Sequence, residues 1–92
     1  MIQESKLKVI VVEDEEKDCK VIEKILTDYY QHIVSIQGIS QAVDDAVAKI
    51  STLKPDLVFL DIVIQGNRYG AFDILERTNP DFQIIFITGI TI

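Results

Sequence analysis

Three carboxylates and one hydroxyl follow apolar runs of the sequence, and these side chains are the ones best suited to chemistry. Glu13 and Asp14 follow the first run, Asp61 follows another, and Thr88 follows the last. If the runs are neighbouring parallel strands, their carboxyl ends meet where open α/β sheets bind ligands. Each acid alone is typical of a solvated strand end. Together they would repel one another, so they predict a divalent cation with oxygen ligands, Mg²⁺ or Mn²⁺.

The strands that must position these residues can be recognised from hydrophobic patterns. Continuous apolar runs predict buried strands at residues 9–12, 57–60 and 84–87. Apolar and polar residues alternate over residues 33–39, which predicts a strand with one wet face at a sheet edge. The four runs therefore predict four strands, three of which end on the chemically interesting residues.

In the segments between these strands, apolar residues are spaced as in helices. Ser40 is a candidate N-cap for a second helix, which Pro55 ends because proline lacks an N–H and pushes Lys54 out of the helical region. A third helix is predicted over residues 71–78, with Phe72 and Leu75 on one side. The first helix carries one apolar stripe: Val21, Ile22, Ile25, Leu26 and Tyr29.

Strands that alternate with helices predict an α/β fold, with a doubly wound parallel sheet and helices on both faces. With 92 residues, the chain has room for one domain. The first turn is acidic from Glu13 to Glu16. Sheets that bind nucleotides offer phosphate a glycine-rich turn instead, so a Rossmann or P-loop site is excluded.

The charge balance restricts the partners. Fifteen acidic and nine basic residues give a net charge of −6, which argues against binding to nucleic acid or to an anionic membrane. No apolar run approaches the roughly 20 residues of a membrane helix, and the N-terminus does not resemble a secretory signal. Cys19 is the single cysteine, which favours a reducing, cytoplasmic setting and a thiol without a reactive role.

Three segments resemble a bacterial response-regulator receiver domain. They are residues 9–15, with an acidic pair after the first strand, residues 55–62, with the pattern Pro-Asp-apolar-Asp, and residues 84–89, with a threonine after the last strand. The resemblance extends from Lys6 to Gly89. It implies a CheY-like, flavodoxin-like sheet with the strand order 2-1-3-4. It also implies a cytoplasmic phosphorelay protein of a two-component system, with a sensor histidine kinase as partner.

The resemblance implies a role for each acid of the cluster. Asp61 is the expected phosphoryl acceptor, a role that a carboxylate can fill by forming an acyl phosphate. Asp14 and Asp61 are expected to ligate Mg²⁺ directly, Glu13 mostly through water, and Val63 through its backbone carbonyl. Glu13 stands where many relatives have aspartate. Phosphoryl transfer depends mostly on positioning and charge neutralisation, which the cation supplies.

The Thr88 hydroxyl and the Gly89 N–H are expected to receive the phosphoryl oxygens. Receivers of this family continue with a helix, a fifth strand and a last helix, so we expect a receiver domain over residues 1–92 that is C-terminally incomplete. The family's lysine at the end of strand five is then absent from this chain. Loss of one such transition-state group costs on the order of 10²–10³ in rate. The site is therefore expected to bind metal and to phosphorylate poorly.

Three functions remain open at this point. The first is a phosphoacceptor receiver, which is no enzyme beyond its own phosphorylation and dephosphorylation. The second is a receiver-fold interaction module that is not phosphorylated, which the absent lysine favours. The third is a Mg²⁺-dependent phosphatase with Asp61 as nucleophile, but haloacid-dehalogenase-like enzymes need a second aspartate where this chain has Val63. Residues 70–75 also resemble receivers attached to LytTR-type DNA-binding domains.

The last predicted strand suggests an assembly. Residues 84–87 are apolar on both faces, as in a strand from a sheet interior, and no later strand follows in this sequence. A bare apolar edge is a template for pairing with another chain. The missing last helix would also leave apolar surface uncovered. We therefore expect a homodimer or a larger assembly through strand 84–88, the tail from Gly89 to Ile92 and the uncovered sheet face.

Overall fold

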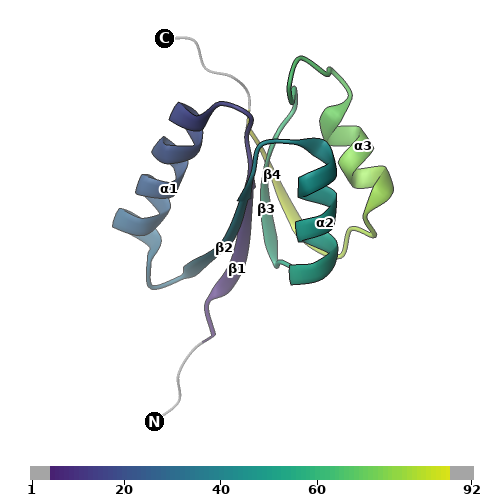
Figure 1. Cartoon of the computed structure of the whole chain (residues 1–92). Coiled ribbons are helices and arrows are strands. Elements are labelled where there is room, and N and C mark those ends of the chain that lie inside the picture. Colours follow the sequence, from purple (N-terminus) through teal and green to yellow (C-terminus); the bar gives the residue numbers. More distant parts are fainter. Residues whose placement is uncertain (1–4, 88–92) are drawn as a thin grey trace.

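The structure is a computed structural model that describes residues 5–87. Four strands and three helices alternate along the chain (Figure 1). Among these helices, none has the length and apolar character that crossing a bilayer requires. The elements are β1 (Leu7–Val12), α1 (Glu16–Tyr30), β2 (Val34–Ser40), α2 (Val43–Leu53), β3 (Leu57–Asp61), α3 (Gly70–Arg77) and β4 (Gln83–Ile87).

The four strands form one parallel sheet in the order β2-β1-β3-β4. This order confirms the predicted 2-1-3-4 topology and places the wet strand β2 at an edge. β1 and β3 are central, and Val12 pairs with Leu60, so the residues that follow each of them emerge side by side. The topology therefore brings the ends of the first and third strands together, as the acidic pattern required.

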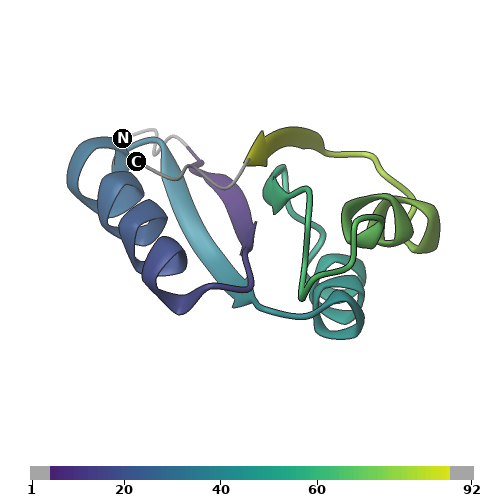
Figure 2. The ribbon, with the colours of Figure 1, turned by 90° about the horizontal axis from the view of Figure 1, so that it is seen from above.

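The helices cover the two faces of the sheet unequally. α1 lies on one face, and α2 and α3 lie on the other (Figures 1 and 2). On the two-helix face, a continuous core joins the sheet to α2 and α3: Ile10, Val12, Ala46, Ile50, Val58, Leu60, Ile64, Ala71 and Ile74. The core under α1 is smaller and contains Val9, Val11 and Leu26. The α1 face is therefore the less completely packed one.

The second helix begins later than predicted, because Ser40 belongs to β2. Its carbonyl accepts the Glu13 N–H at 2.9 Å, and its buried hydroxyl donates to the Ala42 carbonyl at 3.0 Å. The N-cap of α2 is Ala42, without a side-chain cap, so the prediction for Ser40 was wrong. The predicted stop is confirmed: Lys54 takes a left-handed conformation with φ 48° immediately before Pro55.

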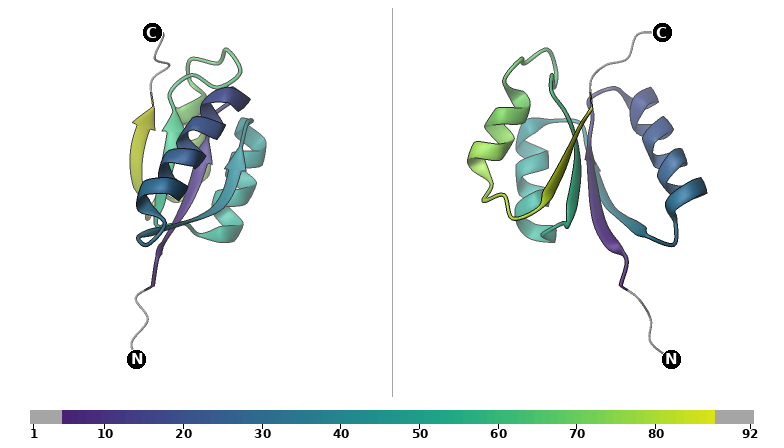
Figure 3. Two further views of the ribbon diagram at one scale, coloured as in Figure 1. Left: turned by 90° about the vertical axis from the view of Figure 1, so that its left-hand side faces the viewer. Right: turned by 180° about the vertical axis from the view of Figure 1, so that it is seen from behind.

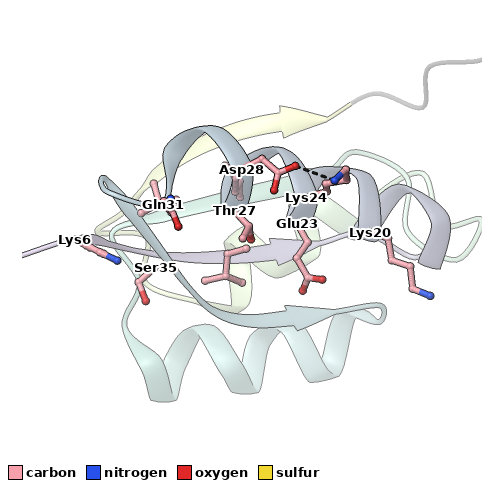
Figure 4. Close-up of a pocket in the computed structure, with 11 residues that line it drawn as sticks. Lys6, Lys20, Glu23, Lys24, Thr27, Asp28, Gln31 and Ser35 are labelled. Atoms are coloured by element: carbon pink, nitrogen blue, oxygen red, sulfur yellow. Dashed lines mark ion pairs between the residues drawn. The ribbon is translucent and has the colours of Figure 1, made fainter.

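Only part of the α1 stripe meets the sheet. Leu26 is buried, but Val21, Ile25 and Tyr29 are exposed. The flank of α1 beside β2 is polar and includes Lys20, among other residues of the groove between them (Figure 4). With 3.6 residues per turn, the exposed apolar positions lie on the opposite flank of the helix, toward β3 and β4.

The buried face of α3 also differs from the prediction. Ala71 and Ile74 are fully buried, Leu75 packs partly against the core, and Phe72 is 55% exposed. The helix is only eight residues long, so two neighbouring stripes fit its apolar positions almost equally well. The structure selects the stripe with the smaller residues, and it packs into the core beside α2.

Candidate metal centre

The sheet brings the three predicted acids to one point. Glu13 and Asp14 follow β1, Asp61 ends β3, and one carboxylate oxygen of each lies within 4.8 Å of the others. Glu13 is 2% exposed and Asp61 is 6% exposed, whereas Asp14 is half-buried. The predicted convergence of the carboxylates is therefore observed in the structure.

Three hydrogen bonds fix Glu13. Its N–H donates to the Ser40 carbonyl of β2 at 2.9 Å, and the buried Cys19 thiol donates to its carbonyl at 3.0 Å. One of its own side-chain oxygens, Oε1, accepts the Glu15 N–H at 3.1 Å. The acidic loop is thus tied both to the neighbouring strand and to the first turn of α1. Cys19, which the sequence analysis treated as a bystander, is part of this support.

The other two carboxylates also accept backbone N–H groups. Asp61 Oδ1 accepts from Val63 at 3.2 Å, and Asp14 Oδ2 accepts from Gln65 at 2.8 Å. Gln65 lies 51 residues from Asp14 in the sequence, and sequence reasoning did not identify it. The one available signal was Gly66, which marked a turn in the loop after β3.

Crowding and burial shift the titration of the cluster. Burial, together with the neighbouring Asp61 and Asp14, raises the pKa of Glu13 from 4.5 to about 8, although the Glu15 N–H acts in the opposite direction. Burial also raises the pKa of Asp61, and the charge of Asp14 adds to this effect. Without a cation, Glu13 therefore keeps a proton near neutral pH. A bound cation would favour release of that proton near neutral pH, because its positive charge stabilises the carboxylates.

The donor set fits a small divalent cation. Oxygen ligands suit Mg²⁺ and Mn²⁺, and the three acids supply them at one end of an open cleft. The backbone carbonyl of Val63 stays a prediction as a ligand, and Thr88 and Gly89 lie outside the described residues. Within the described chain, neither lysine nor arginine lines this cleft, whose walls are Glu13, Asp14, Glu15, Asp18, Asp61, Ile62, Val63 and Gly66.

A second groove lies between α1 and β2 (Figure 4). Its charged groups are exposed, and Lys24 is already paired with Asp28 at 2.9 Å. Its floor is apolar, with contributions from Leu26 and Ile36. Since no buried polar group points into it, this groove offers no comparable chemistry.

The comparisons with known proteins agree with this geometry. No protein-family model matches the chain. Among curated proteins, the nitrogen assimilation regulatory protein NtrX of Azorhizobium caulinodans is 31% identical, over 88% of this chain. The chain spans 18% of the length of NtrX. The similarity therefore concerns one part of that regulator.

Solved structures give the same result for the fold. A variant of the anti-anti-sigma factor PhyR from Bartonella quintana superposes with a TM-score of 0.74 and 28% identity, over 94% of this chain and 35% of PhyR. The response regulator domain of Thermotoga maritima CheB gives 0.75 and 24% identity, over 91% of this chain and 61% of that one. PhyR has also been solved in complex with the anti-sigma factor NepR. The chain therefore has the receiver fold of response regulators.

Proposed function

We propose that this domain is the phosphoacceptor of a two-component response regulator, in which Asp61 accepts a phosphoryl group from a histidine kinase or a small phosphodonor. The observation that carries the proposal is the convergence of Glu13, Asp14 and Asp61 within 4.8 Å at the ends of two central strands of a receiver fold. The domain performs no other catalysis. A cytoplasmic location suits its single thiol, Cys19.

The chemistry is a displacement at phosphorus. A carboxylate oxygen of Asp61 forms a bond to phosphorus while the bond from phosphorus to the donor breaks, and the donor leaves with the electron pair. Asp14 and Asp61 would hold the cation directly and Glu13 mostly through water, and its positive charge would offset the repulsion between this acidic site and the phosphoryl oxygens. Thr88 and Gly89 are proposed to receive those oxygens.

Phosphorylation can be tested directly on the purified chain. Incubation with acetyl phosphate and MgCl₂ should add one phosphoryl group, detected by intact-mass spectrometry. Asp61→Asn should abolish the addition, and EDTA should suppress it. Asp56→Asn is a matched control, because Asp56 is an exposed aspartate at the other end of β3, where it accepts the Lys8 N–H. Equal labelling of the Asp61→Asn variant would refute the assignment.

One observation favours an interaction module as the second candidate function. Among the described residues, the cleft has no lysine or arginine that could neutralise a transferring phosphoryl group. If the chain binds Mg²⁺ but acetyl phosphate adds no mass, the receiver fold serves binding alone. The complex of PhyR with NepR supports the idea that a receiver-containing protein binds a protein partner.

We also propose that the chain assembles with itself through β4. β2 has an irregular register, which leaves Gln37 without a partner on β1, and such irregular polar edges resist further pairing. β4 instead pairs regularly with β3 along its whole length, and four of its five residues are apolar. In the right-hand view of Figure 3, β4 forms the near edge of the sheet.

The uncovered face beside β4 continues this apolar edge. Ile85 and its neighbour Phe59 on β3 lie on the α1 side of the sheet, and Ile85 is 45% exposed. Val21 and Ile25 of α1, the helix on this face (Figure 2), are also exposed. Exposed apolar side chains along a sheet edge are typical of a protein–protein contact. It supports a second copy of this chain as the partner.

A further inference from the structure

Asp14 is held in place from the loop after β3. The N–H of Gln65 donates to Asp14 Oδ2 at 2.8 Å. This N–H belongs to a tight turn in which Ile64 and Asn67 exchange backbone hydrogen bonds of 3.2 and 2.9 Å. Ile64 is fully buried and anchors the turn in the core. The position of Asp14 is therefore set by a hydrogen-bonded turn after β3 as well as by its own loop.

The turn depends on two consecutive left-handed residues. Gln65 has φ 53° and Gly66 has φ 73°. Glycine adopts such a conformation freely, and asparagine adopts it more easily than most other residues. Glutamine has no such preference, so the sequence places a less favoured residue at the position whose N–H reaches Asp14. The contact with Asp14 compensates for this cost.

All three acids share the same arrangement. Glu13 Oε1 accepts the Glu15 N–H at 3.1 Å, and Asp61 Oδ1 accepts the Val63 N–H at 3.2 Å. Each carboxylate of the cluster thus has one oxygen bound to a backbone N–H. The bond to Asp14 is the shortest of the three, and its donor lies 51 residues away in the sequence, in the loop after β3.

We propose that the Gln65 N–H is a positioning group that restricts Asp14 to one-oxygen coordination and so makes the site prefer Mg²⁺ over Ca²⁺. Mg²⁺ needs a compact octahedron with few protein ligands, whereas Ca²⁺ takes more oxygens and readily uses both oxygens of a carboxylate. The Gln65 N–H takes one lone pair of Asp14 Oδ2 and fixes the orientation of the carboxylate, which makes two-oxygen coordination less favourable and so suits the first ion better than the second. This inference rests on the metal site of the proposed function.

The experiment compares two substitutions of Gln65. Gln65→Pro removes the N–H and cannot adopt a positive φ, whereas Gln65→Asn keeps the N–H and tolerates it. MgCl₂ and CaCl₂ titrations, followed by amide chemical shifts in NMR spectra, give the affinity for each ion. We expect Gln65→Pro to lower the ratio of Mg²⁺ to Ca²⁺ affinity by about tenfold, the scale of one charge-assisted hydrogen bond. Gln65→Asn should keep the ratio.

A second pair of variants tests the same inference in case Gln65→Pro does not fold. Gly66→Val disfavours the left-handed turn without touching Asp14, and Gly66→Asn is its matched control. The inference is overturned if the parent chain binds Mg²⁺ but both disruptive variants that fold keep its selectivity. If the parent chain binds no Mg²⁺, the metal site of the proposed function fails too, so the two failures are distinguishable.

Discussion

At the scale of single residues, protonation of Glu13 makes the stability of the fold depend on the acidic cluster. The pKa of Glu13 is about 8 in the folded chain, against 4.5 for a free group. Between these values the folded chain binds more protons than the unfolded chain. The contribution of protonated Glu13 to the free energy of unfolding is therefore complete below pH 4.5, and it is lost as the pH rises through about 8. Asp61, whose pKa is also raised, acts in the same direction.

In EDTA we expect the free energy of unfolding to fall as the pH rises from 4.5 to 8. Urea denaturation at several pH values measures this slope, and Glu13→Gln should reduce it. The lowered pKa of Asp45, which comes mainly from its bond with Lys49, acts only at more acidic pH. A free energy of unfolding that is constant or rises over this range would contradict the prediction.

Asp61→Asn should stabilise the metal-free chain. The substitution keeps the size of the side chain and an oxygen that can accept the Val63 N–H, but it removes one charge from a crowded cluster. We expect the melting temperature in EDTA to rise by about 4–8 °C, the shift that about 1 kcal/mol gives in a small domain. MgCl₂ should then raise it further by less than in the parent. A lower melting temperature in EDTA would show that repulsion is not the dominant effect.

The cluster of acids could be predicted from the sequence because strand ends are local features. An acid that follows an apolar run in a parallel sheet lies at a known edge, whatever the loops do. The contacts of Cys19 with Glu13 and of Gln65 with Asp14 could not be predicted in this way. They depend on how a loop folds over the sheet, and the hydrophobic periodicity of the sequence does not indicate this.

At the scale of the elements, the start of α3 packs on the loop that forms the cleft. A Cβ added at Gly70 would lie 3.0 Å from Ile64 Cβ, closer than most such contacts, so the fully buried Ile64 would have to shift by a few tenths of an ångström. We expect Gly70→Ala to destabilise the chain by about 1–2 kcal/mol, although alanine favours helices. Gly38→Ala is the control, because its Cβ would meet neighbours at an ordinary 3.5 Å. Chemical denaturation of both variants tests whether Gly70→Ala lowers the free energy of unfolding more than Gly38→Ala does.

The helices show where amphipathic patterns stop being informative. The spacing of Val21, Ile25 and Leu26 correctly indicated a helix, but it did not show that half of the stripe lies beside an uncovered region. For α3, Phe72 was the larger apolar residue, yet Ala71 is the one buried in the core that α3 shares with α2, and Phe72 is exposed. A sequence reports which residues can be buried, whereas the neighbouring elements decide which of them are.

At the scale of the whole molecule, the topology followed from the alternation of strands and helices. Parallel strands need crossover connections, and the right-handed rule leaves few arrangements for four of them. The resemblance to receivers selected the order that the structure shows. The sequence also distinguished the two edges, because β2 alternates and β4 does not. The proposed pairing of β4 with a second copy involves another molecule, and the pattern of a single chain contains no signal for its geometry.

The exposed apolar edge makes self-association the property of the whole molecule that is easiest to test. Ile85 and Phe86 lie on opposite faces of β4 and are 45% and 48% exposed, so a charge at either position should disturb an intermolecular contact more than the core. We expect the purified chain to form a homodimer or larger assembly in light scattering at micromolar concentration. Phe86→Lys and Ile85→Lys should each shift it toward the monomer. Ile33→Lys is the control, because Ile33 is 55% exposed but precedes the opposite edge strand. A folded monomer at these concentrations, or equal effects of all three substitutions, would refute assembly through β4.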